Sequence, residues 1–307
     1  MISLAEALRW LEAECPCLSP ETVDLAQASG RVLARDVTLH AAPAWPTASI
    51  DGLAVRAAET EGASEYAPLP VRGARVRAGF SMPEGTDAVA ELHDSGAVLA
   101  SVARGHGVAQ PGHDVAAGSV LRAGVRLTAM HLAMLRDAPS VVRRPGIGGD
   151  ASPMIQALAV QAGAVSSGRI SLLVDPVGGF PVSIAGLAIR PGETVALGLL
   201  DGTPAIRLPL HPADAATVFA VLAAPVLRRM GGLAEPLPIR ARLTRKIASG
   251  LGRMDAIRVH VQDGDAAPLG PADGLGLAIA ATATGLVLVP EGSEGYPAGA
   301  MVTVIPL

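Results

Sequence analysis

PAIRLPLHPADAATVFAVLAAPVLRRMGG, residues 204–232, predicts a strand that leads through a short loop into a long helix. Two glycines, Gly231 and Gly232, end this helix. Two arginines in its last turn interact favourably with the negative end of the helix dipole. Upstream, SPMIQALAVQAGA (152–164) predicts a second helix and RISLLVD (169–175) predicts a buried strand. GETVALGLL (192–200) predicts another strand. The alternation of strands and helices favours an α/β layer at the centre of the chain.

The sequence on either side of this centre predicts other kinds of structure. SLAEALRWLEAE (3–14) predicts a helix that starts with a capping box formed by Ser3 and Glu6. Glycine and proline interrupt residues 69–125 at short intervals, which predicts a small β module. RLTAMHLAMLRDA (126–138) predicts a helix with Thr128 as N-cap. We read RRPGIGGD (143–150) as a boundary, with GIGG as a turn, and the tail 239–307 as strands only.

The composition limits the classes of partner and compartment. The chain has 307 residues, enough for about two to three domains. Its formal net charge of −4 argues against a nucleic-acid partner or an anionic membrane surface. No stretch has 18 consecutive apolar residues, and the N-terminus has no apolar core of a signal peptide, so we expect a cytoplasmic protein. Cys15 and Cys17 have a spacing that favours two ordinary thiols.

Several common active-site motifs are absent from the sequence. The seven histidines show no HxxxH or HExxH spacing, and no Walker A or GxSxG motif occurs. GIGG lacks the full dinucleotide-binding pattern. PAWPTASIDGLAVR (43–56) holds one acid, Asp51, inside an otherwise apolar and small-residue run. Its approach is stiffened by two prolines, and Gly52 after it permits a tight turn.

PAWPTASIDGLAVR resembles the signature of the molybdopterin molybdotransferases, the molybdenum insertases that include the E domain of gephyrin. The resemblance covers nearly the whole chain, in the order and spacing of the family's segments. SMPEGTDAV (81–89) and PGHDVAAGSVLRAGVRLTAMHLAML (111–135) resemble its N-terminal motifs. Residues 204–232 resemble the strand, loop and helix of its central domain, and 252–259 and 285–307 resemble its C-terminal domain.

The resemblance implies a fold of the α/β plus β class with an elongated, multidomain architecture. We expect a discontinuous N-terminal helical part at 1–35 and 115–144, with an inserted β module at 36–114. We expect a trimmed, molybdopterin-binding-like α/β domain at 145–234 and a C-terminal β barrel at 235–307. The trimming falls between 165 and 189, where the family has a helix, a strand and a glycine-rich loop with a catalytic acid.

The resemblance also implies an activity and its site residues. Family members bind molybdopterin, activated as an adenylate, and molybdate; they release AMP and leave molybdenum on the dithiolene. Mg²⁺ is the implied metal. Asp51 occupies the position of the family's active-site acid, where it would help to hold the metal ion or the oxyanion. On local sequence alone, Asp51 before a glycine is more often the cap of a turn, so both roles stay open.

Several departures from the family pattern bear on the site. Glu193 stands where the family has a lysine, Leu210 replaces a loop glycine, and Asp214 replaces a small hydroxyl residue in the first turn of the long helix. A carboxylate in that first turn would take up free N–H groups and repel phosphate. The substrate-binding candidates that remain are Arg190, Arg207, His211, Asp214 and Arg253.

Two hypotheses about function therefore stay open. In the first, the protein handles the cofactor in molybdenum cofactor biosynthesis through a degenerate active site. In the second, it is a catalytically inactive dimeric paralogue that binds or scaffolds a molybdoenzyme. The resemblance implies a homodimer in both cases, and a client molybdoenzyme or cofactor-synthesis protein as a further partner.

Overall fold

The computed structural model describes residues 1–91, 93, 97–136, 140–165, 169–175 and 177–307. The contacts divide the chain into two compact units. The first comprises Met1–Arg35, Ala123–Leu132 and Asp137–Leu307, and the second comprises Asp36–Arg122 and Ala133–Arg136. The division into four parts suggested by the sequence stays a prediction.

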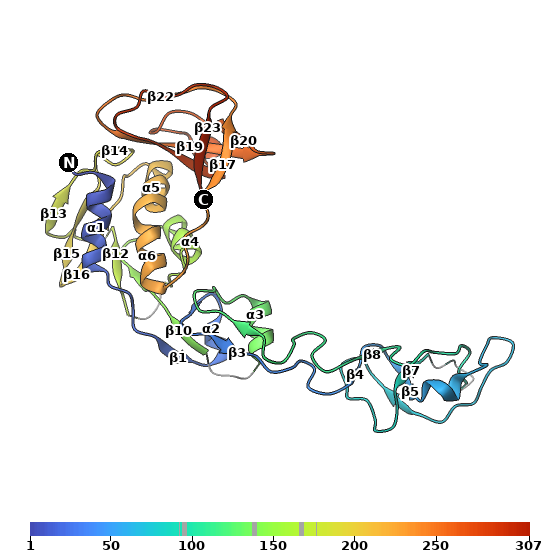
Figure 1. The fold of residues 1–307 in the computed structure, drawn as a ribbon. Coiled ribbons are helices and arrows are strands. Elements are labelled where there is room, and N and C mark those ends of the chain that lie inside the picture. Colours follow the sequence, from blue (N-terminus) through green and yellow to red (C-terminus); the bar gives the residue numbers. More distant parts are fainter. Residues whose placement is uncertain (92, 94–96, 137–139, 166–168, 176) are drawn as a thin grey trace. The chain divides into compact units, whose positions relative to one another are not determined.

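A five-stranded mixed sheet lies at the centre of the first unit (Figure 1). Its strand order is β11-β12-β16-β15-β13. The first three strands run parallel, and the last two are antiparallel to their neighbours. The bounds are β11 Ile147–Gly148, β12 Leu172–Val174, β13 Val182–Ala185, β15 Ala196–Leu200 and β16 Thr203–Arg207. The parallel register brings the carboxyl ends of β11, β12 and β16 to one edge of the sheet.

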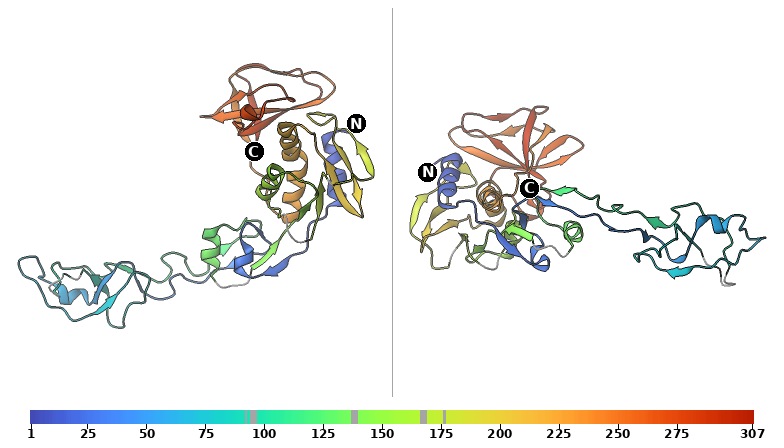
Figure 2. Two further views of the ribbon diagram at one scale, coloured as in Figure 1. Left: turned by 180° about the vertical axis from the view of Figure 1, so that it is seen from behind. Right: turned by 60° about the horizontal axis from the view of Figure 1, so that its bottom comes forward.

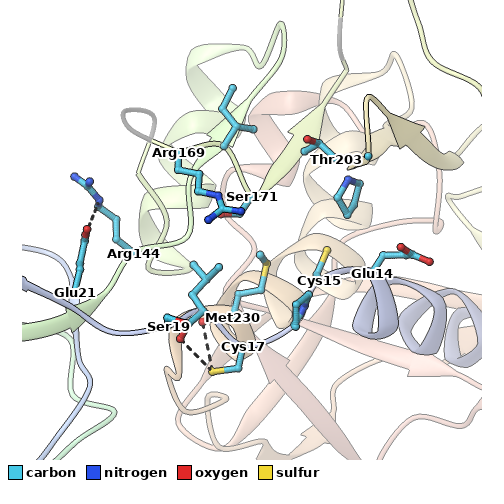
Figure 3. A pocket seen from close by; sticks show the side chains of 15 residues that line it. Glu14, Cys15, Cys17, Ser19, Glu21, Arg144, Arg169, Ser171, Thr203 and Met230 are labelled. Atoms are coloured by element: carbon cyan, nitrogen blue, oxygen red, sulfur yellow. Dashed lines mark hydrogen bonds and ion pairs between the residues drawn. The ribbon is translucent and has the colours of Figure 1, made fainter.

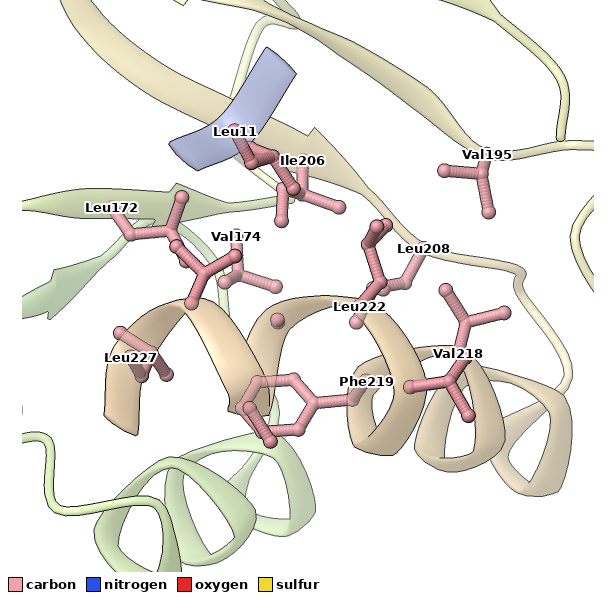
Figure 4. Close-up of a cluster of buried hydrophobic side chains, with 14 of the residues drawn as sticks. Leu11, Leu172, Val174, Val195, Ile206, Leu208, Val218, Phe219, Leu222 and Leu227 are labelled. Atoms are coloured by element: carbon pink, nitrogen blue, oxygen red, sulfur yellow. The ribbon is translucent and has the colours of Figure 1, made fainter. Parts of the chain in front are cut away.

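Helices pack side by side against this sheet, as Figures 1 and 2 show. They are α1 (Leu4–Glu14), α4 (Pro153–Gln161), α5 (Pro212–Val218) and α6 (Ala224–Gly231). Alternate strand residues such as Leu172, Val174 and Ile206 point into the same core as Leu11 and Phe219 (Figure 4). Because the sequence has 2% aromatic residues, aliphatic side chains build this core almost entirely. The α1 helix therefore contributes its apolar face to the α/β core.

The predicted helix after residue 211 is continuous but changes its winding. Between α5 and α6, residues Phe219–Ala223 form a π-helical segment. The N–H of Ala224 donates to the carbonyl of Phe219, five residues earlier. The next residue, Pro225, has no N–H to donate and crowds the preceding turn, and a locally widened turn accommodates such a residue. Gly232 ends the helix with φ of 71°, as predicted for its C-cap.

The C-terminal part of the first unit is a closed barrel of five strands in the order β19-β20-β17-β23-β21, because β21 also pairs with β19. The two-residue strand β14 (Ile189–Arg190) extends this sheet beside β19. The bounds are β17 Ile239–Leu243, β19 Met254–Gln262, β20 Asp265–Pro268, β21 Gly285–Val289 and β23 Met301–Pro306. A short β18–β22 pair, Ile247–Ala248 with Gly295–Tyr296, lies outside the ring. Val259, Val287 and Val304 belong to the separate apolar core of this barrel.

The rest of the first unit includes a small sheet in the order β1-β10-β2, formed by Glu21–Val23, Ser140–Arg143 and Val32–Leu33. Helix α2 (Leu25–Ala28) is a single short turn. The second unit is mostly short strands with small apolar clusters. Its elements are β3 Val37–Thr38, β4 Thr47–Ala48, β5 Gly52–Val55, η1 Ala57–Thr60, β6 Ala74–Val76, β7 Ala88–Ala90, β8 Val108–Ala109 and β9 Val120–Leu121. Helix α3 spans Ala129–Leu135.

Most expected elements are present, with specific differences. Ser3 and Glu6 form the predicted capping box of α1. The GIGG segment is not simply a turn, since Ile147 and Gly148 pair with β12 as strand β11. The tail is not strands only, because it contains the short helix α7 (Leu277–Ala280). Residues 137 and 138 of the helix predicted at 126–138, and 166–168 and 176 of the shortened segment, lie outside the described residues.

Candidate functional site

The carboxyl ends of the three parallel strands border a cavity of about 400 Å³, which we call the carboxyl-edge cavity. Asp150 follows β11, Asp175 follows β12 directly, and Arg207 is the last residue of β16. All three line the cavity, with the N-cap of α4, Ser152. Crevices at the carboxyl ends of parallel strands are the usual ligand sites of open α/β sheets, because loops and helix N-termini converge there. The position therefore makes this cavity the candidate functional site.

A backbone hydrogen bond holds the carboxylate of Asp175 in the cavity. One of its carboxylate oxygens accepts a hydrogen bond from the Leu208 N–H at 2.8 Å. Burial raises the pKa of Asp175, and nearby Asp150 raises it further, while the Leu208 hydrogen bond and Arg207 act in the opposite direction. A half-buried acid with a raised pKa beside a second acid and an arginine is typical of functional sites.

Arg207 is the sequence-predicted cation that the structure places in this cavity. Its guanidinium carbon lies 5.3 Å from the centroid of the Phe180 ring, in a cation–π contact. Its side chain is exposed at the mouth of the cavity, so it is free to contact an anionic ligand. Two carboxylates and one guanidinium give the ionised site a net charge of about −1, which does not favour an anion unless a cation accompanies it.

His211 and Asp214 lie at the start of α5, next to the cavity. His211 is the N-cap of α5, and its Nδ1 lies 3.4 Å from a carboxylate oxygen of Asp214. Asp214 was expected to take up free N–H groups of its own helix. It accepts instead from the Gly274 N–H of the barrel, at 3.2 Å. This carboxylate therefore links the helix start to a barrel loop.

Arg190 and Arg253 are both engaged with acids near the barrel. Asp255 accepts two hydrogen bonds of 2.7 Å, from Nε and Nη2 of Arg190. The Asp255 side chain is 3% exposed, and these bonds raise the pKa of Arg190. Arg253 donates to Glu193 at 2.7 Å, so the acid that replaces a family lysine is neutralised within the chain. Neither guanidinium is therefore a freely available anion ligand.

Asp51 belongs to the second compact unit, on an exposed bend before β5. Its carboxylate accepts a hydrogen bond of 2.8 Å from the Ala78 N–H. This bond leaves further lone pairs of the carboxylate available, so the geometry is compatible with both a turn-fixing role and a ligand-binding role.

Asp175 is not among the site residues predicted from the sequence. The available signal was the acid at the end of the predicted strand RISLLVD, because residues directly after parallel strands reach the ligand edge. Among the described residues, no group of three or more His, Cys, Asp or Glu side chains is placed to hold a metal ion. The described helices also include none that combines the length and apolarity needed to cross a membrane.

Comparison with known proteins gives two family matches. Residues 2–138 match the MoeA N-terminal region, domains I and II, and residues 240–307 match the MoeA C-terminal region, domain IV. Molybdopterin molybdenumtransferase 2 of Mycobacterium tuberculosis is 26% identical over 402 residues, with 99% of each chain covered. Molybdopterin molybdenumtransferase of Bacillus subtilis is 24% identical, with 93% of this chain and 89% of that one covered.

Solved structures share the fold. The molybdopterin biosynthesis MoeA protein of Pyrococcus horikoshii OT3 superposes with a TM-score of 0.63 at 24% identity, with 100% of both chains covered. A molybdenum cofactor biosynthesis protein of Pyrococcus furiosus gives a TM-score of 0.59 at 21% identity, covering 99% of this chain and 98% of that one. The alignment of 402 residues exceeds the 307 of this chain, and residues 139–239 lie between the two family matches. The prediction of a shortened central α/β part and a C-terminal barrel is thereby confirmed.

Proposed function

Because this chain belongs to the MoeA family, we propose that it acts in molybdenum cofactor biosynthesis and binds molybdopterin, or its adenylate, in the carboxyl-edge cavity. The observation that carries this proposal is the meeting of Asp150, Asp175 and Arg207 where three parallel strands end. Apolar side chains of Met154, Ile155 and other residues line the same cavity and would contact the flat pterin ring.

The arginine and the two acids of the cavity have different roles in this proposal. Arg207 would contact a phosphate oxygen of the substrate, since a guanidinium pairs well with phosphate. Asp150 and Asp175 fit a Mg²⁺ ion that is completed by substrate phosphate and water, because Mg²⁺ sites often use only one or two protein carboxylates. Such an ion would also offset the negative charge of the cavity. Molybdate is then the second substrate.

We propose further that insertion of molybdenum is much slower than in a full-length relative. Arg190 and Arg253 are neutralised by Asp255 and Glu193, so fewer cations remain to stabilise an anionic substrate. Loss of a single electrostatic donor in an active site typically costs about 10²–10³ in rate. The same pairing is also compatible with loss of activity, as in the alternative of a catalytically inactive homodimeric paralogue that binds or scaffolds a molybdoenzyme.

The test measures binding and turnover separately on the full chain. Molybdopterin binding is followed by pterin fluorescence, and turnover by AMP release from adenylated molybdopterin plus molybdate. We expect molybdopterin to bind, Arg207→Gln to weaken binding about tenfold, and Asp175→Asn to weaken only the Mg²⁺-dependent component. Arg240→Gln, the same substitution at an exposed barrel position, serves as the matched control.

The outcomes separate the hypotheses. Binding with slow AMP release supports a degenerate insertase, and binding with no AMP release supports the inactive paralogue. AMP release as fast as that of the B. subtilis relative, abolished by Asp51→Asn, would show an intact active site. No molybdopterin binding, or an equal loss in Arg240→Gln, would contradict the assignment of the carboxyl-edge cavity.

A further inference from the structure

A second and larger cavity, of about 520 Å³, opens at the opposite edge of the same sheet (Figure 3). We call it the amino-edge cavity, because Ser171 precedes β12 and Thr203 begins β16. Arg144, Arg169, Ser19 and Cys17 also line it. The proposed molybdopterin site uses the carboxyl ends of these strands, so it leaves this cavity without a role.

Arg144 and Arg169 line the cavity together with two acids, Glu14 and Glu21, and the guanidinium of Arg31 contacts Glu21 from outside the lining. The carboxylate of Glu21 is shared by two guanidinium groups, those of Arg31 at 3.2 Å and Arg144 at 3.1 Å. Burial lowers the pKa of Arg31, and the neighbouring Arg144 lowers it further. One carboxylate cannot fully compensate two guanidinium groups that are both largely shielded from water. The arrangement therefore favours an additional anion.

Arg169 contributes a third guanidinium, and Figure 3 shows its side chain directed toward Ser171. Within the part of the chain that the structure describes, no acid forms an ion pair with it. Another acid at the cavity, Glu14, lies at the exposed end of α1. Hydroxyl groups of Ser19, Ser171 and Thr203 add neutral donors around the same space.

Hydrogen bonds hold the walls of this cavity in place. The Leu18 N–H donates to the Met230 carbonyl at 3.0 Å, and Nε of Arg143 donates to the Leu18 carbonyl at 2.9 Å. Nη2 of Arg229 donates to the Cys15 carbonyl at 2.7 Å. The segment from Cys15 to Leu18 is thus fixed against the end of α6. A preformed cavity loses little conformational entropy when a ligand binds.

We propose that the amino-edge cavity binds a small phosphate monoester with an organic body. Guanidinium groups and several hydroxyls match the three outer oxygens of a phosphate better than the two of a carboxylate. Leu18, Ile170, Pro204 and Met230 provide apolar wall, and a volume of about 520 Å³ leaves room for a body of nucleoside size. This site is separate from the proposed molybdopterin site.

Cys17 offers a direct readout of occupancy. The chain has two cysteines, and both are free thiols. Cys17 is exposed and lines the cavity, whereas Cys15 is buried and burial raises the pKa of its thiol to about 12, so N-ethylmaleimide modifies Cys17 selectively. The probe is AMP, with adenosine as the matched compound that lacks the phosphate. The measurement is the rate of Cys17 alkylation on the full chain, followed by mass spectrometry.

We expect AMP to slow alkylation in a saturable way and adenosine at equal concentration to leave the rate unchanged. Arg169→Gln should raise the half-protecting AMP concentration about tenfold. Arg169 is exposed, so this variant should retain the wild-type unfolding midpoint. Arg207→Gln, which removes a cation from the carboxyl-edge cavity, should leave Cys17 protection unchanged.

Three results would overturn the proposal. They are no protection by AMP at millimolar concentration, equal protection by adenosine, and unaltered protection in a folded Arg169→Gln variant. Protection lost in Arg207→Gln but kept in Arg169→Gln would place the AMP site at the carboxyl edge instead. Failure of molybdopterin to bind would not affect any of these readings, so the two proposals are tested independently.

Discussion

At the scale of single residues, Asp255 of β19 holds the side chain of Arg190, which lies on the neighbouring strand β14. It accepts two hydrogen bonds from Arg190 and one of 2.8 Å from Ser249. We expect Asp255→Asn to lower the free energy of unfolding by about 3 kcal/mol, because it leaves a partly buried guanidinium without its counter-charge. Asp265→Asn is the control: its pair with Arg242 has side chains 43% and 63% exposed, so the expected loss is below about 1 kcal/mol. Equal losses in urea denaturation would contradict this.

Asp175 should give stability a measurable pH dependence. Its pKa is raised in the folded state, mainly by burial, so the folded state holds this proton more tightly than the unfolded chain does. The contribution of Asp175 to stability is therefore greatest below the unfolded pKa of about 4 and is lost as the pH rises through the folded pKa. We expect Asp175→Asn, which can still accept from Leu208, to be more stable than wild type at pH 7 and similar to it near pH 3.5. Urea midpoints at the two pH values test this, and a less stable variant at pH 7 would refute it.

At the scale of elements, the helix after residue 211 depends on Phe219, the largest side chain of the core with 1% exposure. It lies in the π-helical segment and packs toward α4 (Figure 4). We expect Phe219→Ala to cost about 4 kcal/mol of unfolding free energy and Phe219→Leu about 1–2 kcal/mol, because the second leaves a smaller cavity. Chemical denaturation of both variants provides the measurement. Similar costs for the two would mean that the core collapses around the site.

The same helix shows how far local sequence signals reach. Its start, its glycine end and its amphipathic packing were all predictable, because caps and periodicity are local properties. The π-helical segment was not predicted. It accommodates a single proline, Pro225, inside a run that is otherwise helical. Strand β11 was also missed as a strand, because it has only two residues, one of them a glycine, and is held by pairing with β12.

At the scale of the whole molecule, the order of family segments predicted the architecture, but the chemistry of the site needed the structure. Arg190 and Arg253 are reasonable anion ligands by sequence, and their acids lie 65 and 60 residues away along the chain. Only the tertiary pairing shows that both charges are neutralised. The carboxyl-edge acids are brought together in the same way, by parallel strand register. The sequence thus shows which charged residues are present, whereas the fold determines which of them are neutralised by a partner.

At the same scale, the family relationship leads us to propose that the protein assembles as a homodimer. Light scattering should give about 62 kDa, twice the 30.9 kDa of one chain.

Strand β13 ends the five-stranded sheet, and its residue Val182 is 46% exposed, so the strand offers both an apolar surface and an open edge to a second copy. We expect Val182→Lys to weaken the dimer at least about tenfold, because a charge would be buried in the interface. Val160→Lys, at a residue 43% exposed on α4, is the matched control and should leave the dimer intact. A monomer of about 31 kDa for the unmodified chain at micromolar concentration would contradict the homodimer itself. If the Val182→Lys variant remains a dimer, the interface does not lie at the open edge of β13.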